Sequence, residues 1–476
     1  MKVLLFVSLL FLSLFLAPQI QVATRPLVLM HVTIVDVTAN EPIKALKFDQ
    51  AIVISGNRIT AIGQAQNFRA PDGSEIVDAG GRYLIPGLWD MHVHSLVEGR
   101  QGYFFPLLIA NGVTGVRDMG GTLPFAQISQ IRNEINSGKI VGPRYGAVAG
   151  RILDGAGTQL NVAVAVTDPN EARQLVRSFK QSGADFIKVH DRLSRDVYLA
   201  IIDEAKKQKM PVAGHVPFEL TALEVAELGQ KSIEHTTDVF ISGASDEKDL
   251  REELRQHSTD PDARRRVEIK AVAAYDEKRT RTLFSRFASY GTAQCPTLVV
   301  RQSSTYGDND RLNADPRMKY IPKAVRDDWD RTFKERIVAL GPIEQRAERF
   351  RMTLSVVSTM QHANVQILAG TDAPQPYVLP GFSLHDELFL LVKAGLTPMQ
   401  ALRTATLNPA KFLGILDSVG TIEKGKLADL VLLDANPIDD IRNTQRIQAV
   451  VANGRYLPQE QLRALLAQAE AAAARH

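Results

Sequence analysis

The chain has 476 residues, of which 45% are hydrophobic and 23% are charged, and its net charge is +3 at pH 7. This composition excludes a wholly disordered chain and a collagen-like fibre, and no run of basic residues is long enough to predict binding to nucleic acid. Cys295 is the single cysteine, which excludes an intramolecular disulfide and a cysteine-based zinc site.

The first residues have the pattern of a targeting segment. Lys2 precedes an apolar run from Val3 to Ala17, which is shorter than the ~20 residues that a membrane-spanning helix needs. We therefore predict a signal peptide over residues 1–23 and a periplasmic or secreted protein with no stable membrane span after cleavage. The alternative is an uncleaved N-terminal membrane anchor, which would also place the rest of the chain outside the cytoplasm.

Both ends of the chain carry strand signals. Residues 24–85 contain apolar, β-branched runs, and Gly56–Asn57 separates two of them as a tight hairpin turn would. Residues 415–457 have the same character, with Asn453–Gly454 in the turn position. We expect the two end segments to pair into one small composite β domain.

The middle of the chain, residues 86–414, alternates short apolar runs with amphipathic helical stretches. Such alternation predicts an α/β fold with a parallel sheet covered by helices, and eight units predict a (β/α)8, TIM-like barrel. The eight strand candidates are IPGLWDMHVH, VTGVRDMG, YGAVAG, DFIKVH, PVAGHV, SIEHT, AQCPTLVV and VQILAGTD.

Helix signals fill the spaces between these strands. In LTPMQALRTAT, Thr397 is a predicted N-cap, Pro398 occupies the first turn and Gln400 completes a capping box. Residues 245–290 and 301–350 are long, charged and helical, and we interpret them as insertions on the barrel. Residues 458–476 are predicted to form a C-terminal helix. Clear helical stretches are EARQLVRSFKQSG, LSRDVYLAIIDEAKKQ and LTALEVAELG.

Side chains that can bind a metal stand at the ends of five of the predicted strands. The carboxyl ends of barrel strands meet at one face, so these groups are expected to converge. Any one of them has an ordinary alternative, such as a hydrogen-bonded core histidine, but together they suit two divalent ions. The six residues are His92, His94, Lys188, His215, His235 and Asp372.

Lys188 lies in an apolar strand, between Ile187 and Val189. Burial favours the neutral amine of a lysine, and a neutral amine can capture carbon dioxide as a carbamate. That anion has two oxygens with which to bridge two metals. The alternative is an ammonium paired with Asp185 or Asp191 at the rim of the strand.

These residues resemble the amidohydrolase superfamily, in the binuclear branch that carries a carboxylated lysine. Imidazolonepropionase-like, prolidase-like and ochratoxinase-like hydrolases are the nearest groups. The resemblance covers roughly residues 26–457 and implies that the end segments form a β-sandwich beside the barrel. The motifs that carry it are PGLWDMHVH, GADFIKVH, GHVP, SIEHT, LAGTDA, HDELFLLVKAGLTPMQALRTAT and GTIEKGKLADLVLLDANP.

The resemblance also implies a role for each ligand. His92 and His94 would bind the more buried ion, and His215 and His235 the more exposed one. Lys188, as the carbamate, would bridge both ions, which are most often zinc in this family. Asp372 would touch the buried metal and exchange a proton with the bridging hydroxide, as general base and then general acid.

Four further residues are candidates for contact with the substrate. His385 follows the eighth strand and is predicted to bind the substrate or to stabilise the oxyanion, with a surface histidine at a helix start as the alternative. His190 shares its strand face with Lys188. Tyr145 and Arg151 flank the third strand, where Arg151 is expected either to hold a substrate carboxylate or to form a salt bridge at the rim.

The predicted function is hydrolysis of an amide-type C–N bond in a small molecule by a metal-bridged hydroxide. N-acyl amino acids, dipeptides and cyclic amides are the expected substrates. A homo-oligomer is compatible with this prediction. The loop GRILDGAGTQLN lacks the Gly-Gly-His-Gly stretch common in prolidase-like relatives. This difference lies in a substrate-facing loop, so it argues against dipeptidase activity and leaves the metal site intact. Alternatives are an esterase, lactonase or phosphotriesterase on the same metals, or a catalytically silent barrel that binds a partner or acts as a scaffold.

Overall fold

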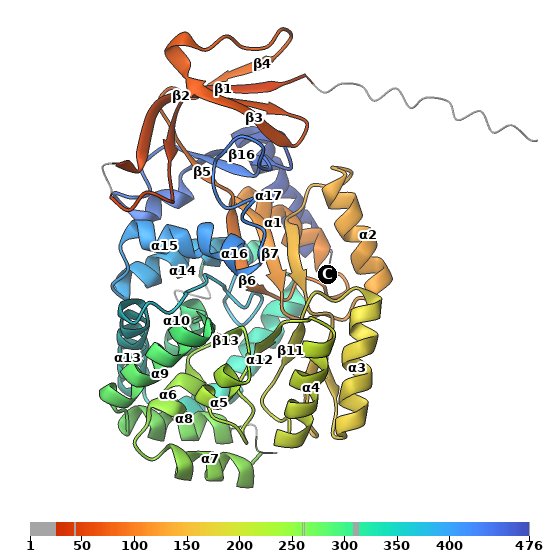
Figure 1. Cartoon of the computed structure of the whole chain (residues 1–476), viewed down its shortest axis with the longest axis vertical. Helices are drawn as coiled ribbons and strands as arrows, with labels where there is room; N and C mark the ends of the chain where they lie inside the picture. Colours follow the sequence, from red (N-terminus) through yellow and green to blue (C-terminus); the bar gives the residue numbers. More distant parts are fainter. Residues whose placement is uncertain (1–24, 42–43, 259, 261, 308–313, 476) are drawn as a thin grey trace, which may run out of the picture.

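The computed structural model describes residues 25–41, 44–258, 260, 262–307 and 314–475, and within the last range it leaves out the side chains of 336–339. A β-sheet at one end of the molecule sits above a larger body of strands and helices (Figure 1). The predicted signal peptide lies outside the described residues, so export stays a prediction. Among the described residues, no helix combines the length and hydrophobicity needed to cross a membrane.

The sheet at the end of the molecule is built from both ends of the chain, as predicted. β5 pairs in parallel with β1 and antiparallel with β15, so it joins the N-terminal and C-terminal strands. The Gly56–Asn57 and Asn453–Gly454 turns each connect an antiparallel pair. The strands form one eight-stranded sheet, and its arrangement as a sandwich stays a prediction. Its members are β1 (Leu27–Val35), β2 (Leu46–Ser55), β3 (Arg58–Gln64), β4 (Glu75–Asp78), β5 (Tyr83–Pro86), β15 (Leu430–Leu433), β16 (Ile447–Ala452) and β17 (Arg455–Pro458).

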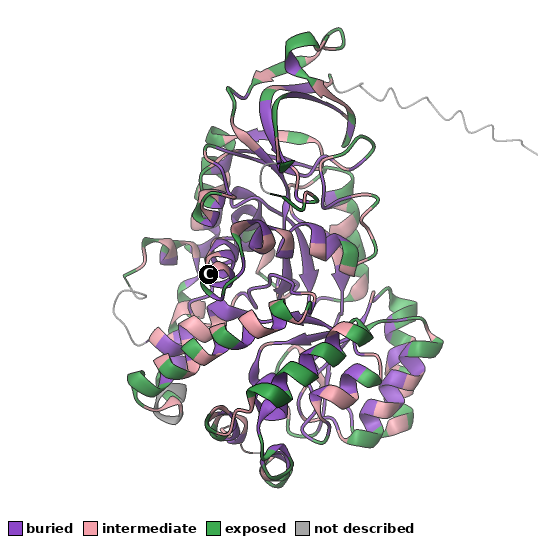
Figure 2. Cartoon of the chain, turned by 60° about the vertical axis from the view of Figure 1, so that its left-hand side comes forward, coloured by how far each residue is buried: buried purple, intermediate pink, exposed green. Residues whose placement is uncertain are grey.

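The body of the molecule contains two parallel sheets, with the strand orders β6-β7-β8 and β10-β9-β11-β12-β13-β14. Most of these strands are buried along their whole length, as strands covered on both faces must be (Figure 2). Their bounds are β6 (Leu88–Val93), β7 (Val113–Asp118), β8 (Arg144–Val148), β9 (Ile152–Asp154), β10 (Ala163–Ala165), β11 (Ile187–Val189), β12 (Val212–Gly214), β13 (Ser232–Glu234) and β14 (Ala293–Cys295).

Backbone hydrogen bonds connect the two parallel sheets at two places. The Asp185 amide, just before β11, donates to the Val148 carbonyl of β8 over 2.9 Å. On the other side, residues 366–373 lie between β14 and β6. Leu368 N donates to Gln294 O over 2.9 Å, and Asp372 N donates to His92 O over 2.7 Å.

Two of the predicted strands differ from the observed ones. In AQCPTLVV, only Ala293–Cys295 is strand, because Thr297 has a positive φ of 48° and the helix α10 begins at Leu298. VQILAGTD is extended but forms only isolated bridges, through Ile367 and Ala373. The short parallel strands β9 and β10 were not predicted.

Helices surround the parallel strands, with exposed outer faces and buried inner faces (Figure 2). The predicted capping box of Thr397 and Gln400 is present, with Pro398 in the first turn. The C-terminal helix α17 packs along α1, where Ala472 lies against Gly102. The helices of the first half are α1 (Gln101–Ala110), α2 (Phe125–Asn136), α3 (Pro169–Ser182), α4 (Arg195–Lys207), α5 (Ala222–Glu227) and α6 (Thr237–Gly243).

The two charged segments predicted as insertions are largely helical, as expected. They contribute α7 to α9, most of α10, α12 and the start of α13. The remaining helices are α7 (Glu247–Gln256), α8 (Ala263–Ala273), α9 (Glu277–Tyr290), α10 (Leu298–Tyr306), α12 (Lys323–Leu340), α13 (Ile343–His362), α14 (Phe382–Lys393), α15 (Pro398–Thr404), α16 (Leu407–Phe412) and α17 (Gln459–Ala473).

Candidate metal centre

The six predicted ligands stand at or near the carboxyl ends of the parallel strands. His92 is in β6 and His94 follows it, Lys188 is in β11, His215 follows β12, His235 follows β13, and Asp372 belongs to the extended segment 366–373. That segment approaches β6 closely at Gly370, where an added Cβ would lie 2.9 Å from the Cβ of His92. A side chain at position 370 would push Asp372 away from the histidines.

Three of the imidazoles converge on the carboxylate of Asp372. Its Oδ1 is 3.4 Å from His92 Nε2 and 3.2 Å from His94 Nε2, and its Oδ2 is 3.8 Å from His235 Nε2. The ring of His235 lies 5.1 Å from that of His92 and 4.9 Å from that of His215, measured between centroids. The structure thus brings residues from four separate strands to one place.

The other ring nitrogen of each histidine, Nδ1, is held by the protein. The acceptors of His92 and His94 carry no proton, and the hydroxyl of Thr297 donates to Pro296 O, so Nδ1 of His92, His94 and His235 acts as the donor. This fixes the tautomer and leaves the Nε2 lone pair for a metal, as in metal-binding histidines generally. Nδ1 of His215 contacts both Asp191 and, at 3.1 Å, the guanidinium of Arg264. The pairs are His92 with Glu234 (3.0 Å), His94 with Gly120 O (2.7 Å), His215 with Asp191 (2.7 Å) and His235 with Thr297 (2.6 Å).

Burial keeps the imidazoles of His92, His215 and His235 neutral, because it lowers the pKa of each. It lowers the pKa of His92 to about 4 and that of His235 to about 3. Burial would raise the pKa of Asp372, but the neighbouring His92 and His94 outweigh it and hold this pKa well below its ordinary value. The site therefore presents neutral nitrogen donors around an ionised carboxylate, which is the protonation state that binds a metal.

Several backbone positions in the site are strained. His235, Thr297 and Asp372 have φ angles of 65°, 48° and 61°, in the left-handed region that residues other than glycine rarely adopt. Such strain is concentrated at functional sites, where the surrounding structure holds the residue in place. Here it aims the side chains of His235 and Asp372 at each other.

Lys188 is buried, with 1% of its surface exposed. Its predicted alternative partners are engaged elsewhere, since Asp185 pairs with Arg132 and Asp191 pairs with Arg264. Among the residues that the structure describes, no carboxylate forms an ion pair with Lys188. Burial lowers the pKa of this amine to about 8.

A buried ion pair between Glu234 and Arg117 orients His92. Glu234 accepts hydrogen bonds from His92 Nδ1, from Ser232, and from the guanidinium of Arg117, whose nitrogen lies 2.9 Å from both carboxylate oxygens. Burial alone would raise the pKa of Glu234, but Arg117 and His92 outweigh it and hold this pKa well below its usual range. This pair was not predicted from the sequence, although the charged residues inside the apolar strands VTGVRDMG and SIEHT were a visible signal.

We expect Glu234→Gln to weaken metal binding. The amide keeps the shape of the side chain but leaves the Arg117 guanidinium buried without its counter-charge, which should cost about 3 kcal/mol of folding free energy. Loss of the carboxylate that orients His92 should lower metal affinity about 10- to 100-fold. Chelator competition followed by metal analysis measures this affinity, with Glu277→Gln on the exposed face of α9 as the matched control. Unchanged affinity in a folded Glu234→Gln variant would contradict the orienting role.

The donor set fits divalent metal ions. One group, His92, His235 and Asp372, places its ligand atoms within 4.8 Å of one another, and so does a second group, His190, Asp191 and His215. The buried Oδ1 of Asp372 has no hydrogen-bond partner. A buried carboxylate oxygen without a donor is costly, and a cation bound between it and the imidazoles would satisfy it.

The amidohydrolase family profile matches residues 83–457, a span that contains all six predicted ligands. The chain belongs to the amidohydrolase family. It is therefore an enzyme that acts on carbon–nitrogen bonds, and the divalent metals that amidohydrolases generally use agree with the histidine and carboxylate groups described above. The predicted superfamily is confirmed.

Amidohydrolases of several kinds resemble this chain. It is 24% identical over 433 residues to the ochratoxinase of Aspergillus niger, covering 77% of this chain and 73% of that protein. It is 23% identical over 447 residues to the dihydroorotase of Pelotomaculum thermopropionicum, covering 88% and 93%. The solved structure of bottromycin amidohydrolase matches with a TM-score of 0.73 at 22% identity, over 94% of this chain and 91% of that one. The structural likeness establishes the shared fold.

His190 lies beside the proposed ligand His215, and its contact with a substrate stays a prediction. Its ring stands 4.1 Å from that of His215, and its Nδ1 is 3.2 Å from Asp154 Oδ2. It lines a cavity of about 400 Å³ together with His215, His235 and Asp372. This position is open to a substrate.

Two of the predicted substrate residues lie outside that cavity, so these predictions are corrected. Tyr145 is buried, and its hydroxyl bonds to Ser95 Oγ over 2.7 Å. Arg151 donates to the Ala163 carbonyl over 2.7 Å, does not line this cavity, and forms no salt bridge with any carboxylate that the structure describes. The hydrogen bond of Tyr145 holds β8 in place, and that of Arg151 holds the loop that follows β8. Flanking a strand in sequence did not determine which way the side chains point.

His385 is likewise a structural residue, contrary to the predicted catalytic role. It is buried in the first turns of α14, and both ring nitrogens are engaged, Nδ1 with Thr444 Oγ1 at 2.9 Å and Nε2 with the Asn111 carbonyl at 3.0 Å. Neither nitrogen remains for a substrate or an oxyanion. The side chain connects α14 with the end of α1 and the 3₁₀ helix Ile441–Gln445.

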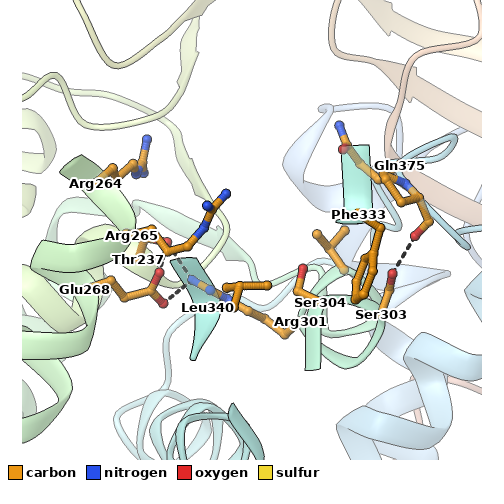
Figure 3. Close-up of a pocket in the computed structure, with 12 residues that line it drawn as sticks. Thr237, Arg264, Arg265, Glu268, Arg301, Ser303, Ser304, Phe333, Leu340 and Gln375 are labelled. Atoms are coloured by element: carbon orange, nitrogen blue, oxygen red, sulfur yellow. Dashed lines mark hydrogen bonds and ion pairs between the residues drawn. The ribbon is translucent and has the colours of Figure 1, made fainter. Parts of the chain in front are cut away.

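A second cavity, of about 230 Å³, adjoins the first and shares Thr237 and Arg301 with it. Figure 3 shows Arg301 turned toward Glu268 and Thr237 on one side, with Phe333 and Gln375 on the other. The helical insertions supply much of this lining, because α8 carries Glu268 and α12 carries Phe333. The insertions therefore shape the approach to the site.

Proposed function

We propose that the chain is a binuclear metallohydrolase that cleaves an amide-type C–N bond in a small molecule. An N-acyl amino acid, a dipeptide or a cyclic amide is the proposed substrate class. The observation that carries this proposal is a set of four histidines whose Nδ1 atoms are all held by the protein. Beside them, the buried Oδ1 of Asp372 faces Nε2 of His92 and of His94 and has no hydrogen-bond partner. This arrangement is costly unless cations bind there.

The parallel strands support a (β/α)8 barrel as the scaffold. The hydrogen bonds from Asp185 to Val148, and those of residues 366–373 to both β14 and β6, connect the two sheets at two places. We infer a closed ring in the order β6, β7, β8, β11, β12, β13, β14 and 366–373. In such a barrel the ligands meet at the carboxyl end of the strands.

We assign the ligands to two ions, with zinc as the proposed metal. His92, His94 and Asp372 would hold one ion, His215 and His235 the other, and Lys188, as its carbamate, would lie between them. When bound, the two ions would lower the pKa of a water molecule and polarise the scissile carbonyl group. Asp372 then accepts the proton of the attacking water and delivers it to the leaving nitrogen.

Metal analysis tests this proposal. We expect the purified enzyme to hold about two divalent ions per chain, and we expect a chelator to abolish hydrolysis until zinc is restored. Activity should be assayed on acyl amino acids, dipeptides and cyclic amides, with lactones and organophosphate esters as comparison substrates. Full activity in protein that contains no divalent metal would refute the mechanism, and turnover of esters alone would refute the proposed bond.

A further inference from the structure

The cavity beside the metal centre is lined by three arginines, of which two are neutralised by the protein. Arg264 of α8 forms ion pairs with Asp191 and with Asp238. Arg301 of α10 pairs with Glu268 and bonds to Thr237, and Figure 3 shows its guanidinium turned toward these two residues. These two guanidinium groups already meet carboxylates, so neither needs an anion from outside.

Arg192, the third arginine, differs from the other two. It lines the same cavity and is half-buried. Its Nε donates to the Ser258 carbonyl over 3.0 Å, and in the described part of the chain no carboxylate forms an ion pair with it. A guanidinium has five N–H donors in a planar fork that matches a carboxylate. The terminal nitrogens of Arg192 are thus available to an anion in the cavity.

The backbone holds Arg192 next to the metal ligands. Its amide donates to Asp154 Oδ1 over 2.8 Å, and Asp154 also faces His190. The preceding residue, Asp191, is the carboxylate that accepts the hydrogen bond of His215. The backbone of Arg192 is therefore fixed directly after Asp191, the partner of a proposed ligand, and its side chain lines the cavity.

Nonpolar side chains line the same cavity. Phe218 and Val300 contribute to its wall, and Leu160, in the loop between β9 and β10, is 38% exposed beside it. An exposed leucine facing a cavity offers a contact for a nonpolar group of a ligand. The lining thus places apolar side chains in the same cavity as the guanidinium of Arg192, and the acidic residue Asp260 of this lining is already paired with Arg266.

We propose that Arg192 binds the carboxylate of the substrate, and that the enzyme prefers amides which carry both a free carboxylate and a nonpolar side chain. This selects acyl amino acids and dipeptides over neutral cyclic amides, and it rests on the proposed hydrolase function. The contact is a charge-assisted, bidentate one. Arg192 thus takes the role of binding the substrate carboxylate, which was predicted for Arg151 from the sequence.

The test compares each acid with its neutral analogue. N-acetyl amino acids with nonpolar side chains and the corresponding carboxamides are assayed with zinc-loaded wild type, Arg192→Gln and Arg192→Lys. We expect Arg192→Gln to raise KM for the acids about 10- to 100-fold with little change in kcat, and to leave kcat/KM for the carboxamides unchanged. Arg192→Lys should retain part of the preference. Arg195→Gln, on the exposed side of α4, is the matched control.

Binding separates failure of this inference from failure of the proposed function. If the wild type hydrolyses none of the compounds, the proposed function is wrong for them, and calorimetry with the same acids and carboxamides then tests Arg192 by itself. Tighter binding of the acids in the wild type, lost in Arg192→Gln, supports the inference. Equal binding of acids and carboxamides, no binding of either, or an equal rise in KM for both overturns it.

Discussion

Replacing Asp372 by asparagine is expected to lower kcat/KM by at least about 1,000-fold. The substitution keeps the size of the side chain but removes the charge that faces His92, His94 and His235. An amide neither accepts the proton of the attacking water nor neutralises a cation. Its NH2 group can also donate to the free Nε2 atoms, which would close the site to metal.

The fold should survive this change, so activity and folding are measured together. We expect the far-UV circular dichroism of Asp372→Asn to match that of the wild type, with the metal content reduced. Asp203→Asn, on the exposed side of α4, is the matched control and should keep full activity. A folded Asp372→Asn enzyme with more than a tenth of the wild-type rate would remove Asp372 from the chemistry.

The ligand set could be predicted because it depends on topology alone. Parallel strands covered by helices all end at one edge, so residues at equivalent strand ends converge whatever their distance in the sequence. His92 and Asp372 illustrate this, since 280 positions separate them and yet their side chains are 3.4 Å apart. The hydrophobic pattern locates the strand ends, and the residue types then suggest the chemistry.

The residues that orient the ligands could not be predicted in the same way. Glu234 supports a histidine on a different strand, and Thr297 supports His235 from a turn whose positive φ has no signature in the sequence. The roles predicted for His385 and Arg151 were wrong because each residue was assigned from its place beside a strand. Where a loop or helix side chain points depends on packing partners such as Asn111 and Thr444, which are distant in sequence.

Lys188→Ala tests the proposed carbamate, and we expect it to lower kcat/KM by about 1,000-fold or more. The lysine is buried and no described carboxylate pairs with it, so its removal leaves a cavity at this position without freeing a buried charge. Short carboxylates such as acetate or propionate should partly restore activity, because they supply two oxygens in the vacated space. Metal content should rise with the rescue.

The rescue is what separates a carbamate from a lysine that only fills space. A structural lysine would be replaced equally well by any small molecule that fits, so an alcohol of similar size, such as propanol, serves as the comparison. Lys206→Ala, on the exposed side of α4, controls for loss of a lysine elsewhere. Full activity of Lys188→Ala without added carboxylate would exclude the carbamate. Equal rescue by propanol would assign Lys188 to packing, because only an anion can replace the charge that a carbamate brings to two cations.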